Sequence, residues 1–180
     1  MANIATKVVT GKVRLSYAHV WEPASINDSK PKYSVSLIIP KSDKETIKKI
    51  NAAVDAAIEE GIAKFGGKKP NRAALKLPLR DGDTEREDEA YKNSFFVNAN
   101  STTAPQIVDR AVNPILDREE VYSGCYARVS INFYAYNTNG NRGIACGLGN
   151  IQKVADGEPL GGRSNAKDDF GSLEEEDFLS

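Results

Sequence analysis

The sequence is poor in the residues and runs that mark secreted, membrane and metal-binding proteins. It has two cysteines, Cys125 and Cys146, without Cys-x-x-Cys spacing, and one histidine, His19. No apolar run approaches the roughly 20 residues that a membrane helix needs, and residues 1–7 lack the apolar stretch of a signal peptide. We therefore expect no membrane contact and a cytoplasmic location, with both cysteines as reduced core residues and His19 packed within a strand.

Motifs of common nucleotide-binding and hydrolytic enzymes are also missing. The run Gly66-Gly67-Lys68-Lys69 lacks the spacing of a phosphate-binding loop, and Gly147-Leu148-Gly149 is followed by Gln152 where a dinucleotide fingerprint needs glycine. The Gly-x-Ser-x-Gly elbow of many hydrolases does not occur. The sequence therefore predicts no enzyme activity and no cofactor.

An acidic cluster over residues 81–89 leaves one enzymatic alternative open, a metal-dependent nuclease that would use Asp81, Asp83 and Asp88. As a calcium loop counted from Asp81, the cluster has Arg86 where glycine is required and Lys92 where glutamate is required. Carboxylates on a soft loop are also poorly placed to hold two metal ions. We therefore predict no metal site.

Charge is divided unevenly along the chain. Residues 1–167 hold 24 basic and 19 acidic residues, whereas residues 168–180 hold six acids and no base. Such a layout suits a body that meets a polyanion and a tail that competes for the same surface or recruits a basic partner. The tail residues that we expect to contact a partner are Asp168, Asp169, Glu174, Glu175, Glu176, Asp177 and Phe178.

Alternation of apolar and polar residues predicts a mainly β protein. The expected strands cover residues 7–21, 33–39, 95–99, 125–136 and 143–148, and the single helix covers residues 42–65. In the first strand, Tyr17 belongs to the face that we expect to be buried. The helix starts with a Ser42-x-x-Glu45 capping box. Asn139-Gly140 predicts a hairpin whose polar loop is longer than two residues.

The outer face of the 126–136 strand carries the clearest functional pattern. A solvent-exposed face normally shows Lys, Glu, Thr and Ser, but Tyr126, Arg128, Tyr134 and Tyr136 stand here. Aromatic rings stack on unpaired bases for about 1–3 kcal/mol each, and arginine neutralises phosphate. The face therefore indicates single-stranded nucleic acid. The alternatives are that the tyrosines cover a second small core, or that they meet another protein in an adaptor role.

Neighbouring segments add further candidates for the same interface. Lys12, Arg14, Lys32 and Arg142 would pair with phosphates. Trp21 and Phe96 would add stacking surfaces, although core filling is the alternative for Trp21.

Several runs in this chain resemble a family of bacteriophage single-stranded-DNA-binding proteins. They are KYSVSL (32–37), the DGD loop (81–83) before FFVNA (95–99), VYSGCYA (121–127), GLGNIQKV (147–154) and DGEPLGG (156–162). The resemblance covers residues 5–163. It implies a five-stranded Greek-key OB-fold barrel over that range, with one long inserted helix and a flexible acidic tail at 164–180.

The same resemblance implies that the protein coats single-stranded DNA in phage replication or recombination, without sequence preference, in the cytoplasm of a bacterial host. The tail would recruit replication or recombination proteins, and a homodimer is compatible with the sequence. One departure concerns the helix. Barrels of this kind usually carry it between the third and fourth strands, but here it follows the second predicted strand.

Overall fold

The computed structural model describes residues 4–25, 30–138 and 140–160. In chain order its elements are η1 (Ile4–Thr6), β1 (Lys7–Val9), β2 (Val13–Ala24), β3 (Lys32–Pro40), α1 (Lys44–Glu60), η2 (Ile62–Phe65), η3 (Arg72–Ala74), β4 (Arg80–Asp81), α2 (Gly82–Glu85), η4 (Glu89–Tyr91), β5 (Ser94–Ser101), β6 (Ile107–Val108), η5 (Arg118–Glu120), β7 (Tyr126–Thr138) and β8 (Asn141–Ala155). The acidic tail lies outside the described residues. Within them, no helix is long and apolar enough to cross a bilayer.

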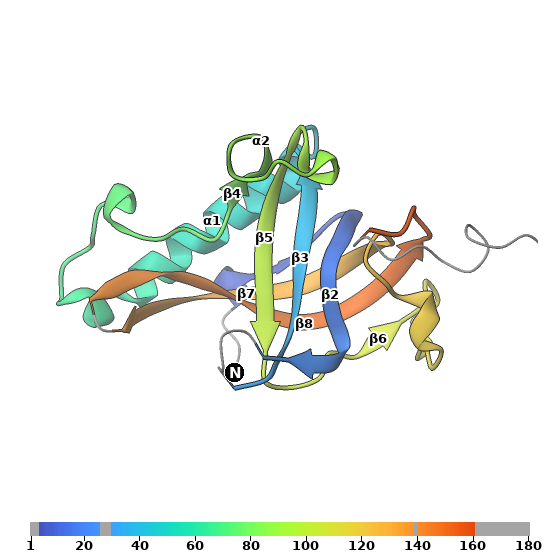
Figure 1. Ribbon diagram of the computed structural model, residues 1–180. Helices are drawn as coiled ribbons and strands as arrows, with labels where there is room; N and C mark the ends of the chain where they lie inside the picture. The colour runs from blue at the N-terminus through green and yellow to red at the C-terminus, as the bar shows by residue number, and fades with distance from the viewer. Residues whose placement is uncertain (1–3, 26–29, 139, 161–180) are drawn as a thin grey trace, which may run out of the picture.

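The long strands form a sheet that curls into a partial ring. β2 pairs with β3 and β3 with β5, all antiparallel. β7 pairs with both β2 and β8, and a single parallel pair, Asn100 with Gly147, joins β5 to β8. In Figure 1, β2, β3 and β5 stand in front and β7 and β8 cross behind them. The prediction of a mainly β protein with one long helix is confirmed.

The β7–β8 hairpin follows the predicted alternation closely. Ala127, Val129, Ile131 and Phe133 are buried, while their neighbours in β7 are half-buried or exposed. The predicted longer loop is wrong, because Thr138 pairs with Asn141 and leaves only residues 139–140 between the strands. Gly140 has a φ of 84°, which two-residue turns require and glycine adopts without steric cost.

The single strand expected over residues 7–21 is two strands, β1 and β2. The break occurs at Thr10, whose side chain is buried and accepts a hydrogen bond from the Val129 N–H at 3.0 Å. The next residue, Gly11, donates its N–H to Thr46 Oγ1 of α1, also at 3.0 Å. These contacts turn the chain between β1, which pairs with β7, and β2, which pairs with β3.

Helix α1 packs against β7 and η1 and closes one side of the ring. Its N-cap is Asp43, whose carboxylate accepts a hydrogen bond from the Thr46 N–H, so the predicted capping role of Ser42 is wrong. Gly61 ends the helix at a point where an added Cβ would lie 2.2 Å from Ala135 Cβ, so only glycine fits. The helix follows β3, in the order that the sequence indicated.

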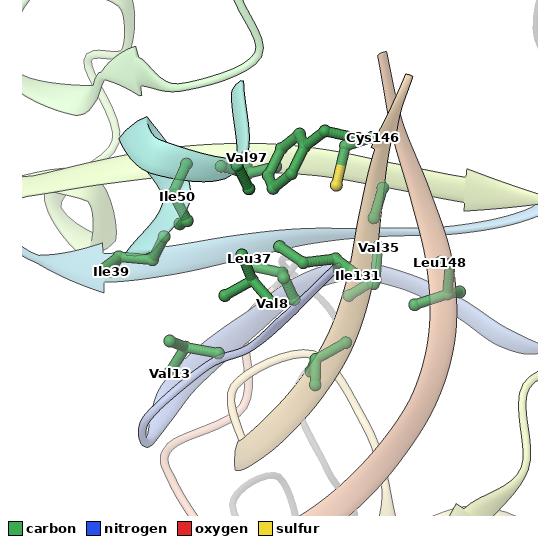
Figure 2. Close-up of a cluster of buried hydrophobic side chains, with 14 of the residues drawn as sticks. Val8, Val13, Val35, Leu37, Ile39, Ile50, Val97, Ile131, Cys146 and Leu148 are labelled. Carbon is green, nitrogen blue, oxygen red and sulfur yellow. The ribbon is translucent and has the colours of Figure 1, made fainter. Parts of the chain in front are cut away.

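The main core fills the ring with apolar side chains, most of them aliphatic, from β1, β2, β3, α1, β5, β7 and β8, as Figure 2 shows. Cys125 and Cys146 are buried free thiols within it, as predicted. A second, smaller cluster lies apart from this core and contains Ile38, Tyr91 and Phe96. Phe96 is 1% exposed, so the prediction that its ring stacks on bases is wrong.

Candidate nucleic-acid interface

A bulge in β2 creates the most pronounced feature of the outer surface. The pairing of β2 with β3 shifts by one residue between Ser16–Ser36 and His19–Ser34, and Tyr17 inside the shift has a φ of 47°. The shift reverses the in–out alternation, so Tyr17 is 55% exposed and His19 is exposed. The predictions of a buried Tyr17 and a packed His19 are therefore wrong.

A groove of about 570 Å³ runs over the outer face of β2, β3 and β5. Its floor consists of short polar side chains in facing pairs, Ser34 opposite Asn100 and Ser36 opposite Asn98. Ser36 is held by the buried Tyr91 hydroxyl, which donates to Ser36 Oγ at 3.1 Å. Such a floor leaves room above the sheet and offers hydroxyl and amide groups to a ligand.

The sides of the groove carry aromatic and basic groups. Tyr17 and His19 come from β2, Lys30 and Lys32 from the entry to β3, and Arg86 from the segment that follows α2. Among the described lining residues, three are basic and none is acidic. The groove therefore suits an elongated anion with flat apolar parts.

The acid-rich segment beside the groove has a structural use for its carboxylates. Lys41 Nζ lies 2.9 Å from Asp81 Oδ1 and 2.7 Å from Asp83 Oδ2. The Lys41 side chain and the Asn93 N–H both favour the charged form of Asp83 and lower the pKa of this carboxyl. Asp88 accepts a hydrogen bond from the Ala90 N–H and caps η4. Within residues 4–25, 30–138 and 140–160, no cluster of His, Cys, Asp and Glu is arranged to hold a metal ion.

The predicted residues of β7 lie on a different face from the groove. Arg128 and Tyr134 are exposed, Tyr134 at 43%, while Tyr126 and Tyr136 are half-buried. Burial raises the pKa of the Tyr134 hydroxyl. Arg128 donates a hydrogen bond to the Thr10 carbonyl at 3.3 Å. The face is outward, as predicted, but none of these residues lines the groove.

The other predicted residues are distributed over several places. Lys32 lines the groove. Lys12 and Arg14 lie over the Tyr126 ring, and Arg14 also donates to the carbonyls of Gly124 and Glu158. Arg142 is half-buried near the tip of the β7–β8 hairpin. Trp21 is half-buried against the core, and its Nε1 donates to the Val121 carbonyl at 2.9 Å.

Sequence reasoning missed most of the groove. The residues it did not select are Tyr17, His19, Ser34, Ser36, Arg86, Asn98 and Asn100. One pattern was available in the sequence. Ser34, Ser36, Asn98 and Asn100 share the outer face of β3 and β5, and these four neighbouring positions are all short and uncharged, without Lys or Glu among them.

A family model described as Enterobacter phage Enc34, ssDNA-binding protein, matches residues 6–179. The chain belongs to this family. It is also 30% identical to protein p50 of Acyrthosiphon pisum secondary endosymbiont phage 1, over 97% of this chain and 99% of p50. The family membership confirms the resemblance noted from the sequence.

Solved structures agree with the family assignment. The single-stranded-DNA-binding protein of bacteriophage Enc34, in complex with single-stranded DNA, is similar with a TM-score of 0.76 and 25% identity, over 88% of this chain and 91% of that chain. The protein gp2.5 of bacteriophage T7, also a single-stranded-DNA-binding protein, has a TM-score of 0.58 at 17% identity, over 92% and 99% of the two chains. The likeness to gp2.5 concerns the fold alone.

Proposed function

We propose that this protein binds single-stranded DNA without sequence preference, in the groove over β2, β3 and β5. The observation that carries the proposal is the lining of that groove, which combines aromatic rings and cations over a polar floor. We further propose that β2, β3, β5, β7 and β8 form a five-stranded Greek-key OB-fold barrel. OB-folds bind oligonucleotides on the outer face of their second and third strands, and β3 and β5 hold those places in this proposal.

Each part of the groove has a role in this proposal. Bases stack on the rings of Tyr17 and His19, since every base has a flat face and stacking tolerates any sequence. Lys30 and Lys32 neutralise phosphates. The short side chains of the floor let the strand lie close to the sheet, and the amides of Asn98 and Asn100 bond to whatever polar edge faces them.

The outer face of β7 remains a second, separate hypothesis for the path of the DNA. It offers Arg128, Tyr134 and Tyr136, with Lys12, Arg14 and Tyr126 beside them and Arg142 near the hairpin tip. One observation favours the groove over this face. The Arg14 guanidinium already donates hydrogen bonds to the carbonyls of Gly124 and Glu158, so it has fewer N–H groups for a phosphate.

The first test is a gel shift with a short single-stranded oligonucleotide of mixed sequence, repeated over a range of salt concentrations. We expect the logarithm of the binding constant to fall linearly with the logarithm of the salt concentration, with a slope of about −2. Each neutralised phosphate of a single strand contributes roughly −0.7 to this slope, and three cations line the groove. Duplex DNA of the same length should bind more weakly, since its bases are not free to stack. Absence of binding to single strands at low salt contradicts the proposal.

We also propose that the protein acts in phage replication or recombination and that residues 168–180 recruit partner proteins while competing with DNA for the basic body. Deleting residues 168–180 should raise the affinity for single-stranded DNA at low salt, because six competing carboxylates are removed. Fluorescence anisotropy with full-length and truncated protein measures the difference. Equal or weaker binding by the truncated protein argues against competition.

A further inference from the structure

Arg86 occupies an unusual position at one side of the groove. Its guanidinium carbon lies 5.0 Å from the centroid of the Phe96 ring, 5.4 Å from that of Tyr91 and 5.8 Å from that of Tyr17. Tyr91 and Phe96 are fully buried and meet edge to face, with centroids 5.2 Å apart. Two rings of this cage are therefore fixed by packing, and the third, Tyr17, stands in the groove.

The charge of Arg86 has no carboxylate partner among the residues that the structure describes. Arg80 provides a comparison, because its guanidinium also lies over the Phe96 ring, at 5.8 Å. Arg80 Nε, however, donates to Glu85 Oε1 at 2.7 Å, and Arg80 does not line the groove. Both arginines therefore lie over the Phe96 ring, but Arg80 is paired with a carboxylate and Arg86 lines the groove.

The segment that carries Arg86 is anchored at Gly82 and Asp83. The Arg86 N–H donates to the Gly82 carbonyl, and Gly82 is buried where an added Cβ would lie 2.4 Å from the Tyr91 carbonyl oxygen. Asp83 accepts hydrogen bonds from Lys41 Nζ and from the Asn93 N–H at 2.7 and 2.9 Å. Asp83 thus holds the segment just before Arg86 in place, and the Arg86 guanidinium lies over the three rings.

We propose that Arg86 and Tyr17 form one nucleotide subsite, in which an unpaired base stacks on Tyr17 and the guanidinium binds the phosphate next to that base. The inference rests on the proposed function of the groove and names the contact that anchors the strand there. A guanidinium held by ring faces keeps its N–H groups at the edge, and these match the two oxygens of a phosphate. The bulge at Tyr17 supplies the adjoining ring surface.

The subsite requires a phosphate and an exposed base face on the same nucleotide. A base that is paired and stacked within a duplex does not offer that face to Tyr17. Free phosphate offers only half of the ligand, because it cannot use the ring. The chemistry therefore selects an unpaired strand of nucleic acid over both duplex DNA and simple anions.

The experiment compares Arg86→Ala, Arg86→Lys and the matched control Arg80→Ala in anisotropy titrations with single-stranded DNA at several salt concentrations. Arg86→Ala should weaken binding at least about fivefold and make the salt slope shallower by roughly 0.7, the contribution of one phosphate. Arg86→Lys should keep the slope and still lose affinity, because an ammonium keeps the charge without the planar fork. Arg80→Ala should match the wild type in both measurements.

A double-mutant cycle with Tyr17→Ala tests whether the two residues act on one nucleotide, since contacting residues that share a ligand give non-additive effects. Additive losses, an unchanged slope in Arg86→Ala, or an equal loss in Arg80→Ala would each overturn the subsite. Thermal melting identifies any variant that is unfolded. If Arg86→Ala is unfolded, the affinity loss in Arg86→Lys still tests the subsite. Failure of the wild type to bind DNA refutes the proposed function. Binding by the wild type with a normal Arg86→Ala variant refutes the subsite alone.

Discussion

Replacing Tyr17 and Lys32 together by alanine should weaken binding to single-stranded DNA at least about tenfold. Loss of one stacked base costs about 1–3 kcal/mol, the upper part of which alone exceeds a tenfold change, and Lys32 adds one phosphate contact. Both side chains line the groove and neither belongs to the main core cluster of buried residues. Fluorescence anisotropy with a labelled oligonucleotide measures the change, and a thermal melt checks that the double variant is folded.

The matched control for this prediction is Arg128→Ala with Tyr134→Ala on the outer face of β7. It also removes one cation and one exposed tyrosine, so both double variants lose the same charge and one aromatic ring. We expect the control to bind nearly as well as the wild type. If the β7 variant loses binding and the groove variant does not, the DNA follows β7, as the sequence alone suggested, and the proposed binding in the groove is refuted.

The alternation of residues in the sequence predicted the outward face of β7 but not that of β2. Strict alternation identified β7 and its outward residues, because side chains in a regular strand alternate between the two faces. In β2 the same rule failed at Tyr17, because one extra residue in the bulge reverses the phase at Tyr17 and His19, and a second irregularity follows between His19 and Ala24. The bulge becomes visible only in the pairing of β2 with β3, which the alternation within β2 does not reveal.

Arg86 and the N-cap show two other limits of the sequence. Arg86 lies in a segment without periodic pattern, and its proposed role depends on Tyr91 and Phe96, which only the fold brings to it. The N-cap of α1 was predicted to within one residue, but Ser42 and Asp43 are both good capping residues and the sequence does not rank them. The family resemblance predicted the function without depending on the position of Arg86 or on the identity of the N-cap residue.

Replacing Phe133 by alanine should lower the free energy of unfolding by about 3–5 kcal/mol, the usual cost of removing a fully buried phenylalanine side chain. Phe133 is 1% exposed on the inner face of β7 and belongs to the main core cluster. Because small domains have only about 5–15 kcal/mol in total, this single change removes a large share of the stability. Urea unfolding followed by circular dichroism measures the loss. If the alanine variant does not fold, Phe133→Leu is measured in its place, and its loss should be smaller.

The neighbouring change Tyr134→Ala provides the control, because Tyr134 is 43% exposed on the opposite face of the same strand. Its cost should stay within about 0.5 kcal/mol, the range of most surface substitutions. The comparison also tests the register of β7 with β8, in which Phe133 lies opposite Cys146 and Tyr134 opposite Ala145. A slip of one residue would exchange the two faces, and the two variants would then exchange their costs. Losses in the reverse order would therefore refute the register and, with it, the outward position of the β7 tyrosines.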